Sequence, residues 1–73
     1  MYACILIRAM RGRVAKVLES VKGIKGVAKA FLVYGRYDIV AFAEAPNFDS
    51  VTGISRGINA VEGVKSTETA VES

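Results

Sequence analysis

The sequence predicts an α+β fold in which two helices cover one face of a four-stranded antiparallel sheet. Four segments have the composition and length of β-strands, and two others have the apolar spacing of amphipathic helices. They follow one another in the order β-α-β-β-α-β, which is the order of ferredoxin-like domains. With 73 residues there is room for a single domain, and we expect it to span residues 1–73.

The first third of the chain predicts a strand followed by a helix. Residues 2–9 (YACILIRA) are apolar on both faces except for Arg8, which is typical of a strand in the middle of a sheet. We expect Cys4, within this strand, to be a small core residue. The apolar residues that follow recur at the spacing of one helix face and predict an amphipathic helix: Val14, Val17, Leu18 and Val21. Gly23 and Gly26 offer the positive φ angles that a helix exit and a turn require.

The middle of the chain predicts a β-hairpin. Residues 27–34 (VAKAFLVY) and 37–45 (YDIVAFAEA) have strand composition, and only Gly35 and Arg36 separate them. A two-residue connection that begins with glycine predicts a tight type II′ turn. The two strands are therefore expected to pair in antiparallel fashion.

The last third predicts a second helix and a final strand. Pro46 ends the sheet, and either Asn47 or Asp49 can cap a helix over residues 48–60. Residues 63–72 alternate as a strand does. One face of this strand carries Lys65, Thr67, Thr69 and Val71, and the other carries Glu68 and Glu72.

The composition excludes several kinds of chemistry. The chain has no histidine and a single cysteine, so it has no residues for a Ser-His-Asp triad, a Cys-His pair or an intrachain disulfide. The usual thiolate and imidazole zinc site is excluded for the same reason. We therefore expect a protein that is not an enzyme and has no catalytic residues, no metal and no cofactor.

Charge and hydropathy favour self-association over other partners. The net charge of +3 comes from scattered residues, which is a weak signal for nucleic acid binding. No apolar run reaches the ~20 residues of a membrane span, and no signal peptide is recognisable, so we expect a cytoplasmic protein with no membrane partner. A hydrophobic content of 52% and a mean hydropathy of +0.35 are high for so small a chain. We expect the sheet face that the helices leave uncovered to meet a second copy.

The segment from Gly35 to Asp38 carries the clearest binding chemistry. A glycine turn exposes backbone N–H groups, Tyr37 adds a rigid ring, and Asp38 offers a carboxylate. These groups together suit a small zwitterion. The alternative is an ordinary hairpin turn in which Asp38 bonds to the backbone.

The second predicted helix contains two glycines one turn apart, Gly53 and Gly57. Each costs the helix up to ~1 kcal/mol relative to alanine. They either form a flat face that a subunit or a ligand approaches, or are tolerated on an exposed helix, and both interpretations remain open. Arg56, between them, is more typical of a solvated charge than of a ligand clamp.

Several of these pieces together resemble one protein family. Residues 34–71 resemble the effector-binding domain of the leucine-responsive and asparagine regulator family (Lrp/AsnC), also called the RAM domain. The resemblance rests on the residues at the third strand's start and in the last strand, namely Gly35, Tyr37, Asp38, Gly63, Val64, Thr67 and Thr69. The loop at Gly12 and residues 21–27 are also similar to the family's first helix and its exit.

The resemblance implies a specific function. Members are ferredoxin-like domains that dimerise through their sheets, often assemble into rings such as octamers, and bind amino acids between dimers. It implies that the ligand-binding residues are Gly35, Tyr37, Asp38, Thr67 and Thr69, with Asp38 attracting an ammonium group or organising the turn. Arg36 or Arg56 are further possible donors to a carboxylate.

The same resemblance implies a role in transcription regulation. Most members carry an N-terminal helix-turn-helix, and this chain starts at the first strand. We therefore expect a stand-alone amino-acid-sensing domain that does not bind DNA sequence-specifically and acts through full-length Lrp/AsnC regulators. The alternatives are a small dimeric α+β barrel enzyme, whose catalytic histidine is missing here, and a purely structural oligomerisation module.

Overall fold

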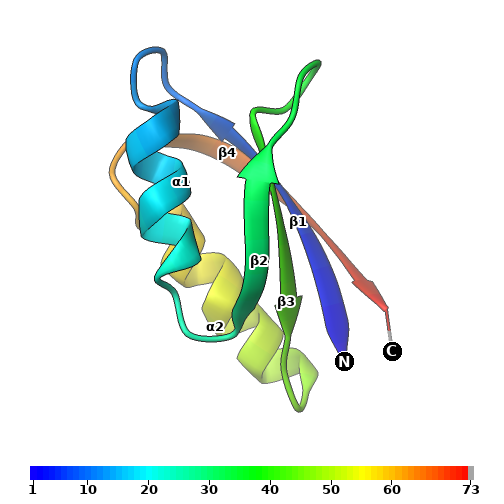
Figure 1. Cartoon of the computed structure of the whole chain (residues 1–73). Helices are drawn as coiled ribbons and strands as arrows, with labels where there is room; N and C mark the ends of the chain where they lie inside the picture. The colour runs from blue at the N-terminus through cyan, green and yellow to red at the C-terminus, as the bar shows by residue number, and fades with distance from the viewer. Residues whose placement is uncertain (73) are drawn as a thin grey trace.

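A computed structural model describes residues 1–72 and confirms the predicted α+β architecture. The elements are β1 (Tyr2–Ala9), α1 (Val14–Lys22), β2 (Val27–Leu32), β3 (Ile39–Glu44), α2 (Phe48–Asn59) and β4 (Val64–Glu72) (Figure 1). All strand pairs are antiparallel, in the sheet order β2-β3-β1-β4. The apolar strand β1 lies in the interior of the sheet, as its composition predicted. Ser73, the last residue of the predicted domain, lies outside the described residues.

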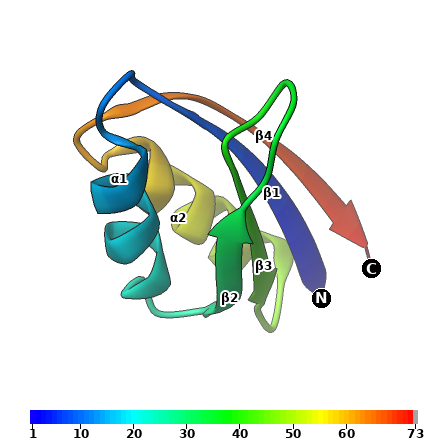
Figure 2. The ribbon, with the colours of Figure 1, turned by 45° about the horizontal axis from the view of Figure 1, so that its top comes forward.

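Both helices pack on the same face of the sheet, and the core lies between the helices and the sheet (Figures 1 and 2). On β1 and β3 every second side chain points to the helices and is buried, because strand side chains alternate between faces. The buried side chains of the two helices are Val17, Val21, Val51, Ile54 and Ile58. Asn47 caps α2, since its Oδ1 accepts a hydrogen bond from the backbone N–H of Ser50 at 2.9 Å.

The connection between β2 and β3 differs from the predicted tight turn. The strands end at Leu32 and resume at Ile39, so six residues form a loop that projects beyond the sheet (Figure 1). The backbone N–H of Val33 donates to the carbonyl of Asp38 at 3.0 Å, so the register of the predicted hairpin is kept, but no backbone hydrogen bond joins Tyr34 and Tyr37 to close a two-residue turn. The prediction of a type II′ turn was therefore wrong, although Gly35 does have a positive φ of 122°.

Only the second of the two glycines after α1 has a positive φ. Gly23 has a φ of −83°, so the prediction for this position was wrong, whereas Gly26 has a φ of +99°. A Cβ at Gly26 would lie 2.5 Å from Cδ1 of Ile54. Residue 26 therefore needs to be glycine both for its backbone angle and for the close approach of α2.

The face of the sheet opposite the helices, which we call the open face, is not covered by any segment of residues 1–72 and is largely apolar. Its centre is formed by Cys4, Leu6, Phe31, Val40, Phe42 and Ala70. The rings of Phe31 and Phe42 have centroids 5.9 Å apart, and they are 42% and 37% exposed. Cys4 is half-buried on this face rather than in the core, which corrects the prediction. Within residues 1–72 no helix is long and apolar enough to span a membrane.

Candidate functional site

Asp38 ties the β2–β3 loop to the end of β1. Its Oδ2 accepts a hydrogen bond from the backbone N–H of Ala9 at 2.9 Å, and its own N–H donates to the carbonyl of Ile7. The side chain and the backbone of Asp38 therefore hold the same strand. Two roles were expected for this carboxylate, namely attracting an ammonium group and organising the turn. Its contacts within the chain are those of the second role.

Tyr37 crosses β1 on the open face and reaches β4. Its hydroxyl donates to Oε2 of Glu68 at 2.8 Å, and Cζ of Arg8 lies 6.0 Å from the centre of its ring. Nε of Arg8 in turn donates to the carbonyl of Arg36 at 2.8 Å. The hydrogen bond to Glu68 raises the pKa of Tyr37, with smaller contributions from burial and the charge of Glu68, while Arg8 and Arg36 act in the opposite direction.

These side chains surround a polar cavity of about 440 Å³, which we call the arginine cavity. Its lining consists of Arg8, Arg36, Tyr37, Ser66, Thr67 and Glu68. Of the predicted site residues, Tyr37 and Thr67 line this cavity, with Arg36 beside them, although the hydroxyl of Thr67 turns away toward Asn59. Arg8 and Glu68 were missed by sequence reasoning, although a charge in the apolar run of residues 2–9 was a signal that could have identified Arg8.

The hydroxyls of Thr67 and Thr69 face α2 rather than the open face. Thr67 Oγ1 donates to Oδ1 of Asn59 at 3.0 Å, and the hydroxyls of Thr69 and Ser55 lie 3.1 Å apart. Both threonines pair with residues of β1 whose side chains point to the helices, so the alternation of β4 dictates this orientation. It agrees with the sequence pattern, which placed both threonines on one face of the strand and Glu68 on the other.

Thr69 lines a second, smaller cavity of about 190 Å³, which we call the threonine cavity. Its other lining residues are Phe48, Val51, Thr52, Ser55, Arg56 and Val71. Because Tyr37 reaches over the open face and Thr69 lies on the helix face, a single chain does not bring these two side chains to one small ligand. Gly35 is exposed in the loop, with open space where a Cβ would stand.

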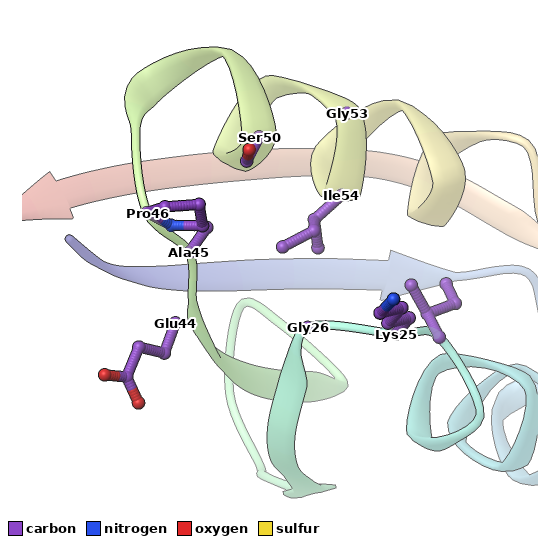
Figure 3. A pocket seen from close by; sticks show the side chains of 9 residues that line it. Lys25, Gly26, Glu44, Ala45, Pro46, Ser50, Gly53 and Ile54 are labelled. Carbon is purple, nitrogen blue, oxygen red and sulfur yellow. The ribbon is translucent and has the colours of Figure 1, made fainter.

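A larger cavity of about 590 Å³ lies away from the predicted site, between α2 and the turn before β2 (Figure 3). Its lining includes Gly53, while Gly57 lies outside the cavities described here. The walls include Ile54, Ala45 and Pro46, and the carboxylate of Glu44 points away from the space in Figure 3.

We place the candidate site at the arginine cavity because several polar side chains converge there. Among residues 1–72, no group of three or more His, Cys, Asp or Glu side chains is arranged to hold a metal.

Comparison with known proteins identifies the family. The model of the Lrp/AsnC ligand binding domain matches residues 2–72, and the chain therefore belongs to this family, as the resemblance predicted. A protein of Thermus thermophilus is 32% identical, with a TM-score of 0.89 over 99% of this chain and 94% of that one. FFRP-DM1 is 26% identical, with a TM-score of 0.87 over 94% of this chain and 93% of that one.

A more distant structure is a transcriptional regulator from Neisseria meningitidis in complex with L-Met. It is 15% identical to this chain, with a TM-score of 0.82, and the match covers 94% of this chain and 47% of the regulator. This chain therefore corresponds to about half of that protein, and the likeness concerns the fold. A search of curated proteins gave no match.

Proposed function

We propose that this chain is an amino-acid-sensing domain that binds a small amino-acid-like effector at an interface between subunits. Its membership of the ligand-binding domain family supports an effector, and the complex of the Neisseria regulator with L-Met supports an amino acid. The site consists of Gly35, Tyr37, Asp38, Thr67 and Thr69. Effector binding changes the assembly of subunits and thereby modulates transcription regulators.

One observation supports a site shared between subunits: the proposed site residues lie on two opposite faces of the sheet. The loop from Gly35 to Asp38 and the arginine cavity belong to one end of the open face, whereas the Thr69 hydroxyl belongs to the helix face. A zwitterion needs partners for both of its charges, because an unpaired buried charge is costly. The loop of one subunit and the threonine cavity of another together supply polar groups on both sides of such a ligand.

Self-association through the open face supplies the basic unit of this assembly. Exposed aromatic side chains are concentrated there, with Tyr2 58%, Phe31 42% and Phe42 37% exposed. A contiguous apolar surface on a small domain is typical of a protein interface. The dimer is the unit from which rings such as octamers are built, and the effector lies between dimers.

The regulatory partners are full-length Lrp/AsnC regulators, with which this domain assembles. The Thermus protein and FFRP-DM1 support a stand-alone role, because this chain covers 94% and 93% of their chains. Sequence-specific DNA binding is not expected of residues 1–72 by themselves. The exposed face of α1 carries Lys16, Glu19 and Lys22, with Arg13 at its N-cap, and α1 has no amide side chain of the kind that reads base edges.

The proposal is tested by thermal unfolding of the protein with each of the twenty L-amino acids, using the D-enantiomers as controls. An effector that binds the folded state raises the unfolding temperature, and the stabilisation grows with the logarithm of one plus the ratio of the free effector concentration to Kd. We expect a shift for a small group of L-amino acids and a change in particle size by light scattering with the same compounds. An intact oligomer that responds to none of them would indicate a structural oligomerisation module instead.

A further inference from the structure

Arg8 and Arg36 form a pair of positive charges at the arginine cavity. The hydrogen bond from Nε of Arg8 to the carbonyl of Arg36 fixes the first side chain against the loop that carries the second. The ion pairs within residues 1–72 are Arg13–Glu62 and Lys22–Glu19, so neither arginine of the cavity has a carboxylate within 4.0 Å. Two guanidinium groups at one cavity repel each other, and a bound anion would relieve that repulsion.

The remaining groups of the cavity leave it with one net positive charge. Among residues 1–72, Glu68 is the only acidic residue that lines the cavity, and its Oε2 already accepts the hydrogen bond of Tyr37. Ser66 lies opposite Arg8 in the β1–β4 register and adds a hydroxyl. Arginine binds carboxylates in a planar, two-pronged geometry, so the carboxylates of an amino-acid effector suit this pair.

We propose that the arginine cavity binds the carboxylates of an acidic effector, so that the effector is an acidic amino acid and not a neutral or basic one. This inference rests on the proposed function and names its ligand class. Such a ligand has two carboxylates for the two arginines and one ammonium group for Glu68. Its net charge of minus one neutralises the cavity, and a volume of about 440 Å³ accommodates a molecule of this size.

Arg36 is the better of the two arginines for a test. Within residues 1–72 its guanidinium takes part in no hydrogen bond or ion pair, whereas the side chain of Arg8 holds the loop. Arg36→Gln therefore removes a charge without removing an internal contact. Arg11→Gln is the matched control, because Arg11 is also exposed but lies in the β1–α1 loop and outside the lining of the arginine cavity.

The experiment is calorimetric titration of the wild-type oligomer and both variants with L-glutamate, L-aspartate and their amides L-glutamine and L-asparagine. An acid and its amide have nearly the same shape, so the comparison isolates charge. We expect one of the acids to bind at least ~10-fold more tightly than its amide, as a charge-assisted bond predicts. Arg36→Gln should remove most of this preference, and Arg11→Gln should preserve it.

The outcomes separate this inference from the proposed function. Equal binding of acid and amide, or an acid preference that survives Arg36→Gln, would overturn the inference and leave amino-acid sensing intact. Tight binding of neutral amino acids alone would do the same. Light scattering of the Arg36→Gln variant gives a further outcome. If the variant loses subunit association while ligand binding is unchanged, carboxylates of a second copy occupy the arginine pair. That result would also overturn the inference. The absence of binding by any amino acid would contradict both proposals.

Discussion

Asp38 and Tyr37 show how a single residue can serve the loop and the site at once. Asp38 satisfies the backbone N–H of Ala9 with its carboxylate, and Tyr37 bridges the loop to β4 through Glu68. The sequence predicted both as site residues from their chemistry. Their partners could not be predicted, because Ala9 and Glu68 are distant in sequence and only the sheet register brings them close.

Removal of the Asp38 carboxylate should destabilise the fold. Asp38→Ala leaves the half-buried N–H of Ala9 without its acceptor, at a cost of about 1–3 kcal/mol. Asp38→Asn keeps an oxygen at the same place and should cost less. Urea denaturation measures both free energies of unfolding. Equal stability of Asp38→Ala and the wild type would show that the carboxylate does not organise the loop.

The raised pKa of Tyr37 predicts a late step in the alkaline titration of the protein. The folded-state pKa lies above the ordinary value of 10.0, so the associated stabilisation is complete below about pH 10 and is lost as the pH rises through the folded-state pKa. Ultraviolet absorption of tyrosinate should show this late step. It should disappear in Tyr37→Phe and move to lower pH in Glu68→Gln. As a control, Tyr34→Phe should retain it, because Tyr34 is fully exposed in the loop.

At the scale of elements, α2 combines a well-packed apolar side with an exposed side that contains Gly53 and Gly57. The packed side is fixed by Val51, Ile54 and Ile58 in the core. An added Cβ at either glycine would have no neighbour within 4 Å among the other elements of residues 1–72, so packing within this part of the chain does not require glycine there. The exposed glycines therefore lower the stability of α2 without an internal benefit.

Alanine substitutions in and near α2 should have opposite effects on stability. Gly53→Ala and Gly57→Ala should each raise the free energy of unfolding by about 0.5–1 kcal/mol, since alanine is the better helix former. Gly26→Ala should lower it by more than ~1 kcal/mol, because its Cβ would clash with Ile54 and its φ is positive. Thermal and chemical denaturation test all three variants. A destabilised Gly53→Ala would indicate that a contact between subunits needs the glycine.

The hairpin shows why local patterns predict elements better than connections. The strand segments around residues 31 and 40 were evident from composition, and their antiparallel pairing is confirmed. The register of the hairpin agrees with the prediction, since Val33 and Asp38 are paired, but the turn is not closed between Tyr34 and Tyr37. Asp38 also binds Ile7 and Ala9 of β1, which lie 31 and 29 positions away and are not evident from a local pattern. In the same way, the pairing of Tyr37 with Glu68 and the opposite orientation of Thr69 depend on the assembled sheet.

At the scale of the whole molecule, helices cover one face of the sheet, and no part of residues 1–72 covers the other face. The helix face carries the buried residues, and the open face carries Leu6, Val40 and the Phe31–Phe42 pair. A chain of this size has a limited core, so burial of the open face against a second copy would add substantially to stability. We expect folding and assembly to be coupled for this reason.

A charge on the open face should dissociate the assembly. Phe42→Lys and Leu6→Lys place an ammonium group in an apolar interface, where burial of an unpaired charge is costly. Light scattering at micromolar concentration should show a dimer or a multiple of a dimer for the wild type and smaller particles for these variants. Met10→Lys is the control, because Met10 is 55% exposed in the β1–α1 loop. A monomeric wild-type protein of 7.8 kDa would contradict assembly through the open face.

The central claim is that the loop of one subunit and Thr69 of another form a single effector site, and a mixing experiment tests it directly. Gly35→Val impairs the loop, because a β-branched residue resists a φ of 122°, and Thr69→Val removes the hydroxyl on the helix face. Each variant alone should bind the effector poorly in calorimetry. Joint refolding of the two should restore wild-type affinity at a fraction of the sites, because some interfaces then combine an intact loop with an intact Thr69. Failure of the mixture to recover any tight binding, when both variants form mixed oligomers, would contradict a site shared between subunits.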